Sequence, residues 1–253
     1  MKLTDTHTHL ADTQLYDQLQ PVLQQAGNVG VWRFIVPSAS VNDWNRVAQL
    51  RAHSVHCAFG IHPWFAKEAD QVSLGKLDKL LQLHPHALIG EIGLDYANKK
   101  QAPESINQQK NVLKQQLKLA MHHSRPVILH NVHAGNDLIC MIKETGFSQG
   151  GFAHAFSGSL EEANEFIKLG FKIGIGSLLL NPMAKKVRKA ASGLPLESIV
   201  LETDSPFMLR NKTNVPANVR RIAEIVAELR NIPLQTLSEQ TEKNVDAILS
   251  FCR

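Results

Sequence analysis

Residues 87–130 read ALIGEIGLDYANKKQAPESINQQKNVLKQQLKLAMHHSRPVILH and contain two short apolar runs separated by a long amphipathic segment. The apolar runs, 87–95 and 126–130, have the length of buried strands. In 104–123 the apolar residues recur every three or four positions, as they do along one face of a helix. Two strands joined by a whole helix must pair in parallel. The stretch therefore predicts a strand–helix–strand unit of a parallel sheet.

The same alternation extends through the whole chain. Further runs of strand length are 2–7, 31–38, 55–62, 150–156, 171–177 and 198–206. Other amphipathic stretches are 42–53, 159–170, 215–231 and 233–253. Eight strand-then-helix units in a chain of 253 residues predict an α/β fold, a closed (β/α)8 TIM barrel of the metal-dependent hydrolase type, with an open doubly wound sheet as the alternative. No linker or repeat interrupts the pattern, so we predict one domain, 1–253, whose last two helices cover the barrel.

Composition limits the class of protein. Hydrophobic residues make up 43% of the chain, and the formal net charge of +4 permits an anionic substrate without requiring one. No apolar run reaches the ~18–20 residues that span a bilayer, and the N-terminus lacks the features of a signal peptide. Cys57, Cys140 and Cys252 are too scattered for a disulfide framework or a thiolate zinc site. We expect a cytoplasmic monomer that needs neither a membrane nor a protein partner.

Histidines and acids gather where the predicted strands end. In TDTHTHL, residues 4–10, His7 and His9 occupy alternate positions, so on a strand they would project from the same face and could share a metal ion. Further ionisable residues at or near predicted strand ends are His62, Glu91, His130, His154 and Asp204. Strand ends converge on one face of a barrel. We therefore predict a site for one or two divalent ions, in which imidazoles suit zinc or manganese and carboxylates also accept magnesium.

Two carboxylates are the candidate catalytic residues. Glu91 interrupts the apolar run ALIGEIGL, and a carboxylate buried there needs a cation. Its two oxygens could bridge two ions ~3.5–4 Å apart. Asp204, in LETDSP, could bind a metal and accept a proton from the attacking water. Glu202, on the same strand face, is interpreted as a supporting acid.

Two further features could contact a substrate. The basic run KKVRK, residues 185–189, could meet a nucleic-acid backbone, although such runs are commonly solvated helix faces. Trp64 and Phe65, beside His62, could stack on a base or pack at the edge of the core. The glycine-rich KIGIGS lacks the spacing and the lysine of a phosphate loop, so a nucleotide cofactor has little support.

Six motifs carry a family resemblance. In chain order they are DTHTHL, GIHPW, GEIGLD, PVILH, HAFSGS and LETDSP. Together they resemble the TatD family of metal-dependent deoxyribonucleases and hydrolases over essentially the whole chain. The resemblance implies a TIM barrel that cleaves nucleic-acid phosphodiesters, often by exonucleolytic trimming, with two divalent ions (Zn, Mn or Mg) per subunit. It places one ion on His7, His9, Glu91 and Asp204, the other on Glu91, His130 and His154, and His62 beside the substrate phosphate.

The chain also departs from the family pattern. Trp64 stands where the family commonly has a histidine, and Val132 and His133 stand where it commonly has arginine and aspartate. The implied metal ligands are intact, whereas the positions expected to meet the substrate differ, so Trp64 is the candidate substrate contact beside His62. The leading prediction is a two-metal phosphodiesterase or deoxyribonuclease. The alternatives are an amidohydrolase-like enzyme acting on a small amide, ester or lactone, and a metal-binding module without catalysis. Many barrels of the amidohydrolase kind have a modified lysine in strand four, and Glu91 there favours the phosphodiesterase.

Overall fold

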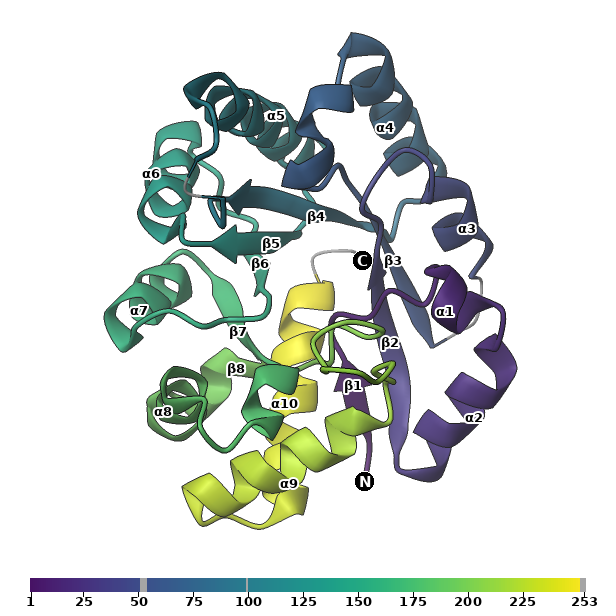
Figure 1. The fold of residues 1–253 in the computed structure, drawn as a ribbon, viewed down its shortest axis with the longest axis vertical. Coiled ribbons are helices and arrows are strands. Elements are labelled where there is room, and N and C mark those ends of the chain that lie inside the picture. Colours follow the sequence, from purple (N-terminus) through teal and green to yellow (C-terminus); the bar gives the residue numbers. More distant parts are fainter. Residues whose placement is uncertain (51–53, 99, 251–253) are drawn as a thin grey trace.

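The computed structural model describes residues 1–50, 54–98 and 100–250. In this part of the chain eight parallel strands follow one another in chain order, each paired with the next (Figure 1). They are β1 (Leu3–Asp5), β2 (Val31–Pro37), β3 (Val55–Phe59), β4 (Leu88–Asp95), β5 (Val127–Val132), β6 (Gly151–Ala153), β7 (Phe171–Ile175) and β8 (Ile199–Leu201). This order confirms the (β/α)8 TIM barrel and contradicts the open doubly wound sheet, in which the order reverses at a switch point.

The barrel closes where β8 meets β1. The Thr6 N–H donates to the Leu201 carbonyl over 3.0 Å, and the Asp204 N–H donates to the His7 carbonyl over 2.8 Å. These bonds satisfy backbone groups that an open sheet would leave at its edges. They also bring the histidines of the N-terminal motif beside the acidic motif of β8, almost 200 residues later in the chain.

Helices surround the strands on the outside (Figure 1). They are α1 (Thr13–Tyr16), α2 (Leu19–Asn28), α3 (Trp44–Gln49), α4 (Gln71–Leu83), α5 (Pro103–His122), α6 (Gly135–Thr145), α7 (Leu160–Lys168), α8 (Lys185–Gly193), α9 (Asn218–Arg230) and α10 (Leu234–Leu249), with the 3₁₀ helices η1 (Pro63–Glu68), η2 (Ser177–Leu180) and η3 (Leu196–Ser198). The predicted helices are confirmed within a few residues. The end of the predicted helix 42–53, residues 51–53, lies outside the described residues, as does the end of the predicted helix 233–253, residues 251–253, which includes Cys252. None of the helices in the described ranges is both long and apolar enough to cross a membrane.

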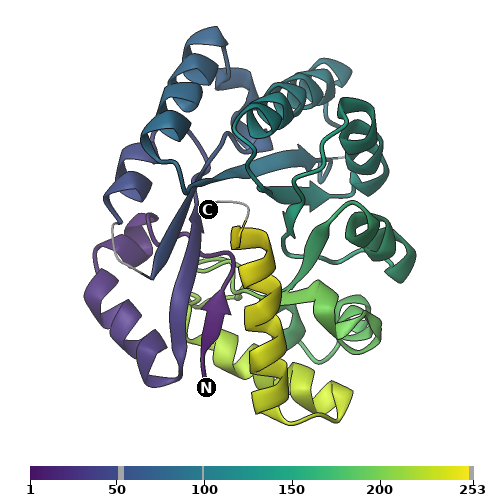
Figure 2. The same cartoon turned by 180° about the vertical axis from the view of Figure 1, so that it is seen from behind.

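The last helix closes the amino end of the barrel, as Figure 2 shows from behind. An apolar cluster fills this end and comprises Ile35, Ala58, Leu88, Ile128, Phe152 and Val200 from the strands, with Val245, Ile248 and Leu249 from α10. Alternate residues of a strand share a face. His130, two positions after Ile128 in β5, therefore projects into the interior one layer above this cluster. The predicted site thus has an apolar floor that keeps water away from it.

Arg33, a buried residue of β2, anchors α10. Its guanidinium donates to Glu242 over 2.9 Å, to Asp246 over 2.6 Å and to the Thr4 hydroxyl over 2.9 Å. We expect Arg33→Met to lower the free energy of unfolding by ~2–3 kcal/mol, somewhat below the cost of breaking a fully buried pair. We expect a value below that of a fully buried pair because one partner, Asp246, has a side chain that is 57% exposed.

Urea denaturation measures this effect. The matched control is Lys168→Met, which removes an exposed ion pair of 2.7 Å with Glu165 and should change stability by less than ~1 kcal/mol. Equal stability of the two variants would show that Arg33 does not hold the helix in place.

Candidate metal centre

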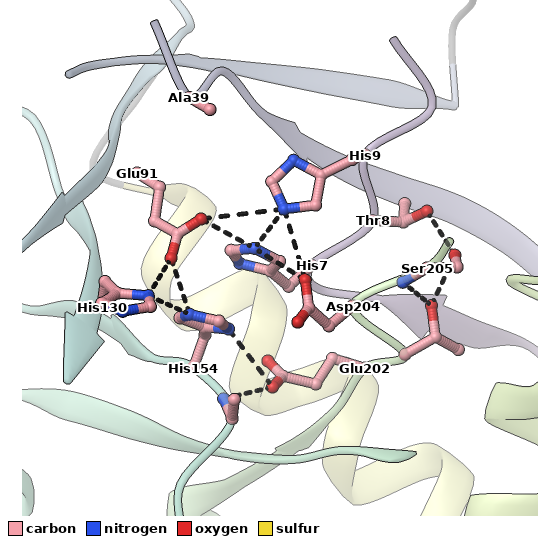
Figure 3. Close-up of polar contacts among 12 residues, drawn as sticks. His7, Thr8, His9, Ala39, Glu91, His130, His154, Glu202, Asp204 and Ser205 are labelled. Atoms are coloured by element: carbon pink, nitrogen blue, oxygen red, sulfur yellow. Dashed lines mark hydrogen bonds and ion pairs between the residues drawn. The ribbon is translucent and has the colours of Figure 1, made fainter. Parts of the chain in front are cut away.

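The seven predicted residues of the site meet inside the barrel at the carboxyl ends of the strands. They are His7, His9, His62, Glu91, His130, His154 and Asp204, and Figure 3 shows all of them except His62. None of these side chains is more than 14% exposed. Residues separated by as much as 197 positions therefore form one buried cluster, as the barrel prediction required.

Glu91 lies at the centre of the cluster, and its two oxygens face different histidines. Oε1 lies 2.6 Å from Nδ1 of His130 and 2.7 Å from Nε2 of His154. Oε2 lies 3.3 Å from Nε2 of His7 and 3.7 Å from Nε2 of His9. One carboxylate thus stands between two pairs of nitrogen donors.

Asp204 adds a second carboxylate on the Oε2 side. Its Oδ1 lies 3.3 Å from Nε2 of His9 and 3.6 Å from Nε2 of His7. The three residues could hold an ion together, because their donor atoms all lie within 4.8 Å of one another. On the opposite side, His62 places its Nε2 3.6 Å from Oε1 of Glu91. Nitrogen and carboxylate donors in this arrangement fit zinc, manganese or magnesium.

Most of the strands end earlier than the sequence predicted. Glu91 lies within β4 as expected, but β1, β3, β6 and β8 stop before the predicted site residues. The loops that follow these strands therefore carry His7, His9, His62, His154 and Asp204. His130, predicted at a strand end, lies inside a longer β5. The strand assignments of these six residues were therefore wrong in detail, although the convergence of the side chains was right.

Asp5 binds backbone groups just beyond the ends of β1 and β8. Its buried carboxylate accepts hydrogen bonds from the N–H of His7 (3.3 Å) and from the N–H and hydroxyl of Thr203 (2.9 and 2.6 Å). A side chain thus replaces the neighbouring strand as the partner of these backbone groups. The network continues from the Thr203 hydroxyl through Ser205 to Thr8, with 2.8 Å between successive hydroxyl oxygens. Figure 3 shows the contact between Ser205 and Thr8. Sequence analysis missed this positioning role, although Asp5 stands two residues before His7.

Asp95 is a second residue that sequence analysis missed. Its Oδ2 lies 3.0 Å from Nε2 of His130 and accepts a hydrogen bond of 2.7 Å from the indole N–H of Trp64. A carboxylate on the far nitrogen of a histidine fixes the orientation of the ring, here with Nδ1 toward Glu91. The signal was present in the sequence, because Asp95 follows Glu91 by four residues in the same strand.

Glu202, interpreted from the sequence as a supporting acid, lies near His154 on the side away from Glu91. Its Oε1 accepts a hydrogen bond from the N–H of Ala155 and lies 3.9 Å from Nδ1 of His154. Burial raises the pKa of Glu202 to about 7, while the charge of His154 opposes this shift. Glu202 lies behind His154 and beside Asp204 (Figure 3).

The carboxylates control the protonation of two histidines. Burial alone would lower the pKa of His9, but the hydrogen bond and charge of Asp204, with the charge of Glu91, raise it to about 9. Burial likewise opposes the charge on His130, whose pKa is raised to about 9 by Asp95 and Glu91. The carboxylates thus favour positive charge at both positions, whether a proton or a metal cation supplies it.

Burial dominates elsewhere in the cluster. It lowers the pKa of His7 to about 4, so this imidazole is neutral and has a lone pair for a cation. Burial also disfavours ionised Glu91, but the charge of His154 and the hydrogen bond from His130 hold the pKa of Glu91 well below its usual range. An ionised carboxylate at this depth depends on nearby positive charge, which a divalent ion supplies more strongly than protons do.

A cavity of about 390 Å³ opens beside the cluster. His154 lines it, together with Tyr96, Asn131, His133 and Lys186. Lys186 belongs to the basic run of residues 185–189, and His133 is one of the positions at which the chain departs from the family pattern. Residues from β5 and from the segments after β4, β5, β6 and β7 thus present polar side chains to any molecule that reaches the cluster.

Comparisons with known proteins identify the family of the chain. Residues 4–250 match the family described as TatD related DNase. The Escherichia coli K12 protein YjjV, named an uncharacterized metal-dependent hydrolase, is 34% identical over 251 residues, which cover 96% of each chain. Its crystal structure matches with a TM-score of 0.90 and 32% identity, over 97% of both chains. Deoxyribonuclease Tat-D of Schizosaccharomyces pombe is 28% identical over 280 residues, covering 92% of this chain and 88% of that protein.

Proposed function

The chain belongs to the TatD-related DNase family of metal-dependent hydrolases, and from this premise we propose that it is a two-metal phosphodiesterase that cleaves DNA, by trimming strands from an end. The observation that carries the proposal is the position of Glu91, whose two oxygens face separate sets of donors in a buried cluster. Such a carboxylate suits a bridge between two cations. The deoxyribonuclease named among the relatives supports nucleic acid as the substrate class.

Under this proposal the residues divide into two ligand sets. The first comprises His7, His9, Glu91 and Asp204, and the second comprises Glu91, His130 and His154. When bound, divalent ions of the Zn, Mn or Mg type make a water nucleophilic at neutral pH and neutralise charge on the phosphodiester. His62 then stands beside the bridge, in a position to meet a phosphate oxygen.

Asp204 and Glu91 have different chemical roles in this proposal. Glu91 is almost fully buried and holds positive charge in place. Asp204 has the most exposed side chain of the cluster, at 14%, and therefore can reach a water that enters from solvent. Its carboxylate is the acceptor for the proton that the attacking water loses. Trp64, at the rim, is the candidate contact for the substrate.

The sequence predictions of a single domain over 1–253, a monomer and a cytoplasmic location remain part of this proposal. Each of them concerns the setting of the enzyme, and none changes the chemistry at the cluster.

Substrate screening with defined metals tests the function. We would strip the protein of metal, resupply Mg²⁺, Mn²⁺ or Zn²⁺, and measure turnover of single-stranded DNA, RNA, and a panel of small esters, amides and lactones. The proposal predicts metal-dependent cleavage of DNA. Metal-dependent turnover of amides or lactones without any cleavage of nucleic acid would establish the amidohydrolase-like alternative instead.

Lys186 permits a finer prediction about the basic run. It lines the cavity beside His154, so we expect it to contact a substrate phosphate. Lys186→Gln should raise KM for single-stranded DNA, leave kcat unchanged, and reduce the slope of log KM against log salt by about 0.7, the value for one contact to a single strand.

Lys189→Gln is the matched control. The charge of Lys189 acts to lower the pKa of Glu161 in α7, and Lys189 does not line the cavity. Steady-state kinetics over a range of salt concentrations would compare the two variants. Equal changes in both would mean that the basic run acts only through its general charge.

A further inference from the structure

Aromatic side chains are exposed at both ends of the cluster of candidate metal ligands. Among the large hydrophobic residues that the structure describes, the exposed aromatic ones are Trp32, Trp64 and Phe207. Trp32 lies at the amino end of the barrel, where its indole N–H donates to Glu242. Trp64 and Phe207, which are 72% and 45% exposed, lie at the carboxyl end beside the candidate ligands. An exposed aromatic surface at the mouth of a site is characteristic of ligand contact.

Trp64 is held in place at one end of the cluster despite its exposure. Its indole N–H donates to Asp95 over 2.7 Å, and its backbone N–H donates to Nδ1 of His62 over 3.1 Å. The indole meets the His62 ring edge to face, with 4.8 Å between ring centroids. Asp95 also contacts His130. The position of the indole is thus tied to the histidines around Oε1 of Glu91.

Phe207 is tied in the same way to the other end. Its N–H donates to the carbonyl of Asp204 over 2.8 Å, which closes a turn directly after the proposed proton acceptor. Its ring packs edge to face against His9, with 5.5 Å between ring centroids. Both His9 and Asp204 belong to the donors on the Oε2 side of Glu91. The two aromatic rings therefore flank the cluster along the direction in which Glu91 would bridge two ions.

We propose that Trp64 and Phe207 each stack one unpaired nucleobase of the substrate, on the two sides of the phosphodiester that is cleaved. The inference rests on the proposed phosphodiesterase function and adds the form of the substrate to it. Rings fixed in this way lose little conformational entropy when a base stacks on them. Base stacking on aromatic side chains tolerates any sequence, because every base has a flat apolar face. In a double helix these faces are covered by neighbouring bases, so the rings select a single strand.

The proposal is tested by removing the aromatic ring from the protein and, separately, the bases from the substrate. The substrates are a single-stranded DNA hexamer and the same strand with every base replaced by a tetrahydrofuran abasic residue. Trp64→Ala and Phe207→Ala should each lower kcat/KM on the hexamer by about 5- to 150-fold, the range for loss of one stacked base. On the abasic strand both variants should equal the wild type, since no base is present to stack.

Further variants separate stacking from other roles of the rings. Trp64→Phe keeps an aromatic face without the indole N–H and should retain most of the activity on the hexamer. Leu83→Ala removes an exposed apolar side chain at the end of α4 and should change neither substrate's kinetics. Metal content, measured by elemental analysis, should be equal in all variants.

The outcomes are distinct. Equal losses on the hexamer and on the abasic strand, reduced metal content, or no loss on either strand would each overturn the stacking proposal while wild-type DNA cleavage persists. Absence of DNA cleavage by the metal-loaded wild type would overturn the proposed function itself.

Discussion

Asp204→Asn is expected to lower kcat for DNA cleavage by a factor of ~10² or more while changing KM little. The asparagine side chain has nearly the same shape but cannot accept a proton from the attacking water. Asp204 is the member of the cluster that reaches solvent most, and His9 and His7 hold its carboxylate in position. The measurement is kcat and KM across pH, with metal content determined in parallel.

Asp17→Asn is the matched control, because Asp17 is an exposed carboxylate at the end of α1. It should leave the kinetics unchanged. If Asp204→Asn kept a near-normal kcat and the acidic limb of the pH profile, the proton acceptor would be another group. Glu202 and His62 would then be the first candidates.

Glu91→Gln should have an effect at least as large, and by a different route. The amide preserves the size of the side chain but removes the negative charge that balances two cations. We expect metal content to fall and DNA cleavage to drop to the rate of the metal-stripped protein, while circular dichroism shows an intact barrel. The apolar floor beneath the cluster is unchanged by this substitution.

Glu161→Gln is a control for the loss of one carboxylate, because Glu161 is exposed on α7. This variant should keep full metal content and activity. A Glu91→Gln protein that still bound two ions per chain with normal affinity would show that Glu91 is not the bridge. Asp204→Asn and Glu91→Gln together thus separate proton transfer at Asp204 from metal retention at Glu91.

The sequence predicted the architecture because its signals are local. Apolar runs and helical periodicity depend on residues within a few positions of one another, and they were sufficient to give eight strand–helix units. The composition of the cluster followed from a general rule, the convergence of strand ends in a barrel. Glu91 was identifiable because a lone carboxylate within an apolar strand needs a cation to offset the cost of its burial.

The parts that sequence analysis missed depend on contacts between distant segments. Asp5 accepts a hydrogen bond from Thr203, 198 residues away, and no local pattern indicates such a pair. Asp95 acquires its role only because Trp64 and His130 approach it from other segments of the chain. Within the basic run, the cavity distinguishes Lys186 from its neighbours, whereas in the sequence the four cations are equivalent.

Crystallographic location of the ions tests the central claim most directly. We would load active, metal-stripped protein with Mn²⁺ and map anomalous scattering around Glu91. The account predicts two peaks ~3.5–4 Å apart, with the Glu91 carboxylate bridging them. One peak should lie beside His9 and Asp204, and the other beside His130 and His154. A single peak, or peaks that Glu91 does not contact, in crystals of protein that cleaves DNA would contradict the two-metal account.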